Sequence, residues 1–207
     1  MFITFEGPEG SGKTTVLKLI AQRLTEEGFP ILTTREPGGT RISEDIRNII
    51  LDTKNTELDP RAEALLYAAS RRQHLVEKIW PAIREGKIVL CDRYLDSSLA
   101  YQGVARGIGF DEILSINMFA TENTFPDLTI YFDIQPEAGL QRIWSNQCRE
   151  VNRLDLEKVQ FHHEVRNGFL DVAKRYPKRI IIVDASKGIN DVFEEVIGIL
   201  RRKLKRQ

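Results

Sequence analysis

The sequence predicts an α/β fold with a doubly wound parallel sheet flanked by helices. Three observations indicate it. Short apolar runs alternate with stretches of helical periodicity, the later runs end in an aspartate, and a glycine-rich loop joins the first run to the first helix. At 207 residues the chain suits a single domain spanning 1–207. Because such folds bind ligands at the carboxyl ends of their strands, the loops that follow the apolar runs form the candidate site.

The first strand is expected at Phe2–Phe5 and the first helix at Lys13–Glu27, with Gly28 as a C-terminal stop. The helix has apolar residues at helical spacing: Val16, Leu17, Ile20, Ala21 and Leu24. Between strand and helix lies GPEGSGKT, residues 7–14. It matches the P-loop pattern in the strand-loop-helix context that the pattern requires. This unit predicts a site for nucleotide phosphates.

The residue types of this loop suit that chemistry. Its glycines allow backbone angles that a Cβ would prevent, so successive N–H groups can converge on phosphate. Lys13 would reach the terminal phosphates as a positive charge, and the hydroxyl of Thr14 would bind Mg²⁺. The expected nucleotide-binding residues are Gly7, Pro8, Glu9, Gly10, Ser11, Gly12, Lys13, Thr14 and Thr15.

A second strand is expected at Pro30–Thr34, followed by the loop REPGGT, whose proline and glycines mark a turn at a strand's end. A short helix follows around Ser43–Leu51. Asp59 and Pro60 have N-cap and first-turn character for a long helix toward Trp80, which Pro81 would end or kink.

Three later apolar runs predict strands buried on both faces: Lys87–Asp92, Leu128–Asp133 and Arg179–Asp184. A last helix should follow with Asn190 as its cap. Asp92 and Asp133 are alternatives for the carboxylate that holds the metal or its water. The nearness of Asp92 to Arg93 favours Asp92, and Asp133 would otherwise cap the helix that Pro136 begins.

Composition excludes several classes of protein. Lys plus Arg and Asp plus Glu both number 30, so no overall positive field favours nucleic acid. No apolar run approaches the length that crosses a membrane, and no secretory leader precedes the first strand. Cys91 and Cys148 form neither a disulfide framework nor a metal-binding spacing. A cytoplasmic protein without nucleic-acid or membrane partners is therefore expected.

Arginines gather where the expected strands end and again further along the chain: Arg35, Arg47, Arg71, Arg93, Arg142, Arg149 and Arg153. Phosphoryl transfer needs positive groups on both the donor and the acceptor phosphates, and an arginine fork can hold a phosphate at two points. For any one of these arginines, the alternative to phosphate binding is a surface ion pair. This alternative is strongest for Arg47 and Arg142.

Four further blocks carry a resemblance to a known family: TREPGGT at 34–40, EALLYAASRRQH at 63–74, DRYLDSSLAYQG at 92–103 and PDLTIYFD at 126–133. Together with the P-loop, and in this order, they resemble bacterial thymidylate kinase nearly end to end. The resemblance implies a P-loop nucleoside-monophosphate-kinase fold with a small lid, a homodimer, and the conversion of dTMP to dTDP with ATP and Mg²⁺.

The resemblance also implies roles for residues of the acceptor pocket. Arg93 should bind the dTMP phosphate, Tyr67 should stack on thymine, and Arg71 should donate to the base oxygen O4. Tyr101 would crowd the ribose 2′ position. Stacking gains about 1–3 kcal/mol for any base, so base identity should depend on hydrogen bonds. The candidates for those bonds are Arg71, Ser98 and Gln102, and Arg47 is a further candidate for the substrate.

Glu9 lies inside the P-loop, where the phosphates would repel a carboxylate unless it faces another group. The resemblance implies that it reaches the 3′-hydroxyl of dTMP. Glu36 is a candidate for the same pocket, with a role in stabilising its loop as the alternative. Gly10 stands where other members of the family place a basic residue, so this chain resembles the class whose catalytic arginine comes from the lid.

The expected lid lies at about 142–158. Arg149 and Arg153 are its candidates to bridge the two phosphates at transfer, with Asp155 orienting one of them. The alternatives to a thymidylate kinase are another nucleoside-monophosphate or deoxynucleoside kinase and, less favoured, a non-catalytic nucleotide-binding switch. The chain has no Asn-Lys-x-Asp guanine signature, and a switch would not need the acceptor-side arginines.

Overall fold

The computed structural model describes residues 1–145 and 152–205. Within them the chain forms a five-stranded sheet in the order β2-β3-β1-β4-β5, and every neighbouring pair of strands is parallel. The strands are β1 (Phe2–Glu6), β2 (Ile31–Arg35), β3 (Ile88–Asp92), β4 (Leu128–Asp133) and β5 (Ile180–Asp184). This arrangement confirms the predicted α/β class and parallel sheet.

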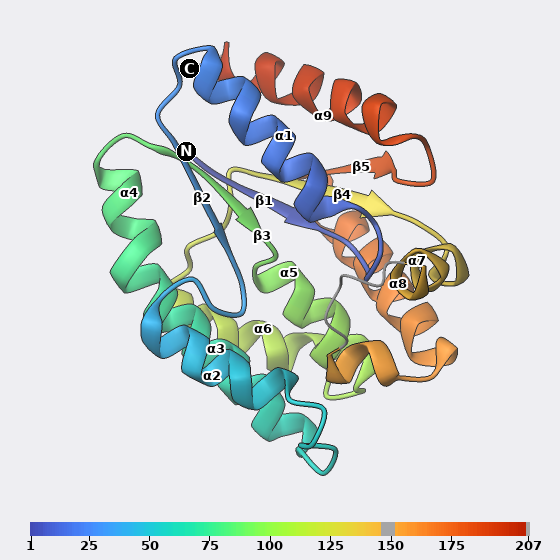
Figure 1. The fold of residues 1–207 in the computed structure, drawn as a ribbon. Helices are drawn as coiled ribbons and strands as arrows, with labels where there is room; N and C mark the ends of the chain where they lie inside the picture. The colour runs from blue at the N-terminus through green and yellow to red at the C-terminus, as the bar shows by residue number, and fades with distance from the viewer. Residues whose placement is uncertain (146–151, 206–207) are drawn as a thin grey trace.

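Helices connect the strands and cover both faces of the sheet (Figure 1). The α-helices are α1 (Lys13–Glu26), α2 (Arg41–Leu51), α3 (Pro60–His74), α4 (Trp80–Arg84), α5 (Leu95–Ser98), α6 (Phe110–Thr121), α7 (Pro136–Trp144), α8 (Val159–Arg175) and α9 (Ile189–Leu204). Two π-helical segments, η1 (Leu75–Ile79) and η2 (Leu99–Ala105), and a 3₁₀ turn, η3 (Arg153–Leu156), complete the described elements.

Buried apolar side chains in the described part of the chain form two clusters, one for each face of the sheet. The first joins Ile3 and Phe5 of β1 to Ile20 of α1 and Val196 of α9. The second joins alternate strand residues to the opposite helices, including Val89, Tyr131, Leu99 and Phe169. The alternation of strand side chains between faces explains why the central strands read as continuous apolar runs.

Burial on both faces is confirmed for β3 and β4, of which only the final aspartates are partly exposed. For β5 the prediction was wrong, since Ile181 and Ile182 are 39% and 46% exposed. The physical reason is position: β5 pairs only with β4 and forms an edge of the sheet, where its side chains have fewer neighbours.

Helix ends follow local chemistry at most of the expected places. Gly28, with φ 88°, lies just beyond the C-terminal end of α1, and the Asp59 carboxylate accepts from the backbone N–H groups of Arg61 and Ala62 at the start of α3. The prediction that Asn190 caps the last helix was wrong, because α9 starts at Ile189 with Gly188 as its N-cap. Pro81 does not end the long helix. The chain passes through η1 and continues as α4, an irregularity expected before a proline that lacks its N–H.

The strand register brings polar residues to one edge of the sheet. Asp92 pairs with Phe5 on one side and Arg35 on the other, and Asp133 pairs with Asp184. The loops after β1, β2 and β3 therefore start at the same edge, and the candidate site lies there.

Candidate active site

The P-loop adopts backbone angles that require glycine. Gly7, Gly10 and Gly12 have φ of 147°, 71° and 83°. A Cβ at Gly10 would also collide with the backbone of Gly139 in α7, so this position is limited by both conformation and space. The loop leads directly into α1, whose first N–H groups and partial positive charge face the same region.

Lys13 is buried in the P-loop. Its Nζ donates to the carbonyl oxygen of Pro8 at 2.9 Å and to the Ser11 hydroxyl at 3.2 Å. Burial, followed by the nearby charge of Arg93, lowers the pKa of Lys13 to about 8, against the opposing attraction of Asp92 and Glu9. An ammonium group held in this way gains most when phosphate charge arrives beside it.

The hydroxyl of Thr14 donates to the carboxylate of Asp92. Asp133, the alternative metal carboxylate, is instead held by Arg166 at 2.7 and 2.9 Å and by the Tyr131 hydroxyl at 3.0 Å. Asp133 does not cap α7 either, because Gln135 is the N-cap residue. The contacts therefore favour Asp92, which lies beside the loop, over Asp133.

Thr14 and Asp92 place a hydroxyl and a carboxylate side by side, and hard oxygens of this kind suit Mg²⁺. Within residues 1–145 and 152–205, no group of three or more His, Cys, Asp or Glu side chains could hold a metal. A magnesium ion here would therefore take its remaining ligands from phosphate oxygens and water, as Mg²⁺ does in many phosphoryl-transfer sites.

A cavity of about 670 Å³ adjoins the loop. Its lining includes these residues expected from the sequence: Glu9, Gly10, Ser11, Gly12, Lys13, Thr14, Thr15, Glu36, Arg47, Tyr67, Asp92 and Arg93. Gly7, Pro8, Arg71, Ser98, Tyr101, Gln102 and Arg153 are not among the lining residues; the last five are buried behind the wall. The structure thus brings the predicted donor-side and acceptor-side groups to one cavity and its supporting wall.

Arg93 is the centre of a buried polar cluster at the acceptor end. It donates to Glu9 Oε1 at 2.8 Å and to the Ser97 hydroxyl at 3.1 Å, and its guanidinium lies 5.2 Å from the centre of the Tyr101 ring. The Tyr101 hydroxyl donates to both oxygens of Glu9, at 2.7 and 2.6 Å. Arg93 also has φ 70°, which is uncommon for a residue with a side chain and concentrates at functional sites.

The charges of this cluster act together on Glu9. Burial raises the pKa of its carboxyl group, but Arg93, Lys13, Tyr101 and His162 outweigh burial and lower the pKa below its ordinary value. Glu9 is therefore an anion inside the P-loop, held away from the phosphate-binding amides by its own partners.

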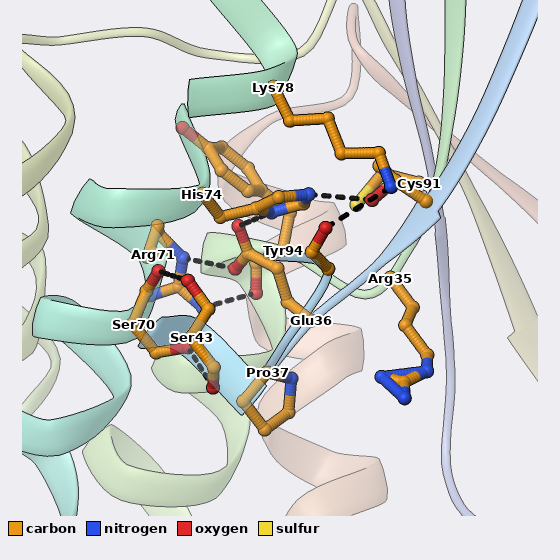
Figure 2. A network of polar contacts seen from close by, with 12 residues as sticks. Arg35, Glu36, Pro37, Ser43, Ser70, Arg71, His74, Lys78, Cys91 and Tyr94 are labelled. Carbon is orange, nitrogen blue, oxygen red and sulfur yellow. Dashed lines mark hydrogen bonds and ion pairs between the residues drawn. The ribbon is translucent and has the colours of Figure 1, made fainter. Parts of the chain in front are cut away.

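Glu36 anchors a second network, shown in Figure 2. Its carboxylate accepts from Arg71 Nε at 2.7 Å, and His74 Nδ1 lies 3.0 Å from its other oxygen. Arg71 also donates to the Ser98 hydroxyl, to the side-chain oxygen of Asn117 and to the Tyr94 carbonyl. These bonds use four of the five guanidinium N–H groups. Glu36 thus stabilises the end of β2 and orients Arg71 at the same time.

Glu63 is a buried carboxylate that the sequence did not single out. It accepts from Arg153, from Gln102 at 2.8 Å and from Arg106 at 3.4 Å. Arg153 also donates to the carbonyl of Ile50 at 2.9 Å. Arg153 was expected to reach the phosphates, but in this structure its guanidinium is buried against Glu63 and Ile50, away from the cavity lining. Gln102 is likewise committed to Glu63.

Three further arginines line the cavity: Arg35, Arg47 and Arg142. Arg47 donates to the Pro37 carbonyl at 2.9 Å, and Arg142 of α7 donates to the Ala185 carbonyl at 3.0 Å. Arg149 lies outside the described residues. Asp155 accepts from the backbone N–H of Asn152 at 2.9 Å and so helps to form a capping box at the start of η3.

Other buried residues of the site were also missed at the level of sequence. His74 and Asn117 hold Glu36 and Arg71, and Glu6 accepts from Tyr94 N and the Ser97 hydroxyl at the end of β1. The sequence held only weak signals for these residues. His74 closes the block EALLYAASRRQH, and Glu6 is a charged residue between an apolar strand and the P-loop.

Comparison with known proteins agrees with this geometry. The family model described as thymidylate kinase matches residues 5–196. The thymidylate kinase of Geobacillus sp. (strain WCH70) is 59% identical over 204 residues, covering 99% of this chain and 97% of that protein. The one from Clostridium novyi (strain NT) is 58% identical over 200 residues, covering 97% and 98%.

A solved structure supports the same relation. The crystal structure of thymidylate kinase from Ehrlichia chaffeensis aligns with a TM-score of 0.78 at 37% identity, covering 97% of this chain and 98% of that one. The match extends over the P-loop, the acceptor wall and the sheet between them, and the chain therefore belongs to the thymidylate kinase family.

Proposed function

We propose that this chain transfers the γ-phosphoryl group of ATP to the phosphate of dTMP, forming dTDP and ADP. The observation that carries the proposal is one cavity with two kinds of wall. Its lining combines the P-loop and Lys13, which suit donor phosphates, with Arg93 and Tyr67, which suit an acceptor nucleotide, and Glu9 of the loop contacts Arg93. A kinase for nucleoside monophosphates needs this pairing of a donor-phosphate cradle with an acceptor-phosphate cation.

On the donor side, the backbone N–H groups of the P-loop and the Lys13 ammonium would hold the β- and γ-phosphates. Thr14 and Asp92 would hold Mg²⁺, which when bound neutralises charge on those phosphates. Preorganised positive groups of this kind lower the barrier because they need no rearrangement as charge develops during transfer.

On the acceptor side, Arg93 would bind the dTMP phosphate and direct one of its oxygens at the γ-phosphorus in line with the departing ADP oxygen. Tyr67 would stack on thymine, while Arg71 would donate its remaining N–H to O4. Ser98 and Gln102 would support base recognition from behind the wall. Glu36 would support it by orienting Arg71, and Arg47 would contribute from the cavity lining. Tyr101 would crowd the ribose 2′ position.

Glu9 would accept a hydrogen bond from the 3′-hydroxyl of dTMP, and this role is consistent with its lowered pKa and its place in the cavity lining beside Arg93. Gly10 contributes no positive charge at transfer, so a lid arginine is assigned that task. Arg149 and Arg153 remain the two candidates. The burial of Arg153 against Glu63 supports Arg149.

Two finer proposals concern the whole protein. A homodimer is supported by apolar side chains exposed on neighbouring helices, Leu65 of α3 at 56% and Phe119 of α6 at 90%. Light scattering at micromolar concentration should give twice the monomer mass, and a monomeric mass would contradict the dimer.

A cytoplasmic location stays a prediction; no described helix is long and apolar enough to cross a membrane.

The test of the function is coupled ADP formation with a panel of nucleoside monophosphates. dTMP should be the best acceptor, with dUMP slower by about 10–200-fold, because one methyl group is worth about 1–3 kcal/mol. Acceptors with cytosine or adenine should fail by more, since their hydrogen-bonding edges do not match Arg71. A different preferred acceptor would identify another kinase of this fold. Equal rates without any acceptor would indicate a nucleotide hydrolase instead.

A further inference from the structure

His162 of α8 occupies an unusual position for a histidine. Its side chain is 2% exposed, and its Nδ1 lies 3.8 Å from Oε2 of Glu9. Its Nε2 is also buried and has no hydrogen-bond partner in the described part of the chain. Leaving a buried polar atom unsatisfied is costly, so an apolar ring would be favoured here if the position only filled space.

Glu9 is held from several sides, and the two oxygens of its carboxylate differ. Oε1 accepts from both Arg93 and Tyr101, whereas Oε2 accepts from Tyr101 and faces His162. The backbone is confined as well, because a Cβ on Gly139 of α7 would stand 2.5 Å from the Glu9 carbonyl oxygen. Oε2 is therefore the oxygen with more capacity to accept a further hydrogen bond.

We propose that His162 is a positioning residue for the acceptor nucleotide: its imidazole orients the Glu9 carboxylate so that Oε2 accepts the sugar 3′-hydroxyl of dTMP. The proposal rests on the assignment of Glu9 in the proposed function. Arg93 and Tyr101 restrain the carboxylate from one side, and His162 restrains it from the helix that follows the lid segment. Fixing an acceptor before substrate arrives reduces the freedom lost on binding.

A purely structural role for His162 makes a different prediction. The ring packs edge-on against Phe161, with 5.8 Å between ring centres, so its removal could disturb the core whatever the substrate. Such a disturbance would affect every acceptor alike. A role through Glu9 would affect only acceptors that carry a 3′-hydroxyl.

The experiment measures kcat/KM for dTMP and for 3′-deoxy-dTMP in His162→Phe and His162→Asn. Phenylalanine keeps a ring of similar size without a hydrogen-bond donor, and asparagine keeps a donor. In His162→Phe the ratio of the two values, dTMP over 3′-deoxy-dTMP, should fall by about twofold to fivefold, as expected for a lost polar contact at 3.8 Å that is longer than a hydrogen bond. His162→Asn should recover part of it. Should the Phe variant fail to fold, His162→Leu takes its place.

His163→Phe is the matched control. His163 is the next residue on α8, but its side chain is 39% exposed and pairs with Glu137 at 2.8 Å. Its substitution should leave the ratio unchanged.

Glu9→Gln separates the inference from the function on which it rests. An unchanged ratio in Glu9→Gln overturns the assignment of Glu9 itself, and the role of His162 falls with it. A reduced ratio in Glu9→Gln with an unchanged ratio in the His162 variants overturns only the role of His162. An equal loss for both acceptors in the His162 variants also overturns it, in favour of a structural histidine.

Discussion

The donor wall and the acceptor wall of the cavity hold anions by different means. The donor wall is nearly contiguous in sequence, since the P-loop residues between Gly7 and Thr15 present backbone N–H groups and the Lys13 ammonium. The acceptor wall is assembled from separate elements. Its lining residues Glu9, Glu36 and Arg93 are joined by ion pairs and hydrogen bonds to one another or to Arg71 and Tyr101 buried behind them. One wall depends on local conformation, and the other depends on the packing of the whole sheet.

The largest effect should follow from removing the Lys13 ammonium from the donor wall. Lys13→Ala is expected to lower kcat by about 10³, because a preorganised charge on the transferring phosphate is lost. Coupled ADP formation measures it, with Lys18→Ala, an exposed lysine of the same helix, as the control. A loss of less than tenfold would show that the backbone alone supports the donor phosphates.

The acceptor wall should respond through dTMP and not through ATP. Arg93→Ala is expected to lower kcat/KM for dTMP by about 10²–10³, because the phosphate loses its cation and Glu9 loses its ion pair. The KM for ATP should change by a few-fold at most. Arg41→Ala removes an exposed arginine paired with Asp45 and should change neither value. Equal changes for both nucleotides would remove the distinction between the walls.

The two lid arginines should separate into a catalytic and a structural residue. Arg153→Ala is expected to lower the free energy of unfolding by about 3 kcal/mol, because Glu63 stays buried with one strong partner fewer. Arg149→Ala should lower kcat by about 10²–10³.

Urea unfolding and steady-state kinetics on both variants decide this point. If Arg153→Ala keeps its stability and loses about 10² in kcat, Arg153 is the phosphate-bridging residue. If both variants keep kcat within a few-fold, the assignment of the catalytic arginine to the lid is wrong.

The pH dependence of kcat/KM for ATP should reveal the lowered pKa of the buried Lys13. Its pKa of about 8 means that the free enzyme loses the ammonium charge as pH rises through that value. The kcat/KM for ATP, which reports the free enzyme, should fall about tenfold per pH unit above about pH 8. A profile that stays flat to about pH 9.5 would place the Lys13 pKa nearer that of an exposed lysine.

The smallest effect should come from Glu6, which is buried at the end of β1 and accepts from Tyr94 N and the Ser97 hydroxyl. Burial, with the charge of Asp96 next, raises the pKa of Glu6 to about 8. Between pH 4.5 and 8 the folded protein therefore binds a proton that the unfolded chain releases, and stability is lost as pH rises through this range. Glu6→Gln should flatten that dependence in thermal unfolding. A steeper dependence in the variant would contradict the raised pKa.

The sequence was sufficient for most residues that act through their neighbours in the chain, with the Asn190 cap as the exception. The glycines at 7, 10 and 12, the stop at Gly28 and the Asp59 cap all follow from local backbone chemistry, and each is confirmed. The strands were placed to within about one residue at each end, because runs of apolar and β-branched residues have few alternatives. Helix α8 had no predicted counterpart, so His162 was missed.

Burial decided two features that local patterns do not indicate. The composition of β5 resembles that of β3, yet β5 is an edge strand with exposed isoleucines, and the prediction of burial on both faces was wrong there. Arg153 stays a candidate for the transfer step, and in the structure it donates to a carboxylate 90 positions away in the chain. No local sequence pattern indicates the exposure of β5 or the partner of Arg153, since both depend on which helices and strands pack together.

The sequence by itself determined that the chain forms a parallel α/β sheet with a phosphate-binding loop after its first strand, because strand, loop and helix preferences act over a few residues. Only the tertiary structure decided which charged groups become partners. Glu9 with Arg93, Glu36 with Arg71 and Glu63 with Arg153 are joined across 84, 35 and 90 positions. A buried charge requires a partner, and the packing of the helices against the sheet determines which one lies within reach.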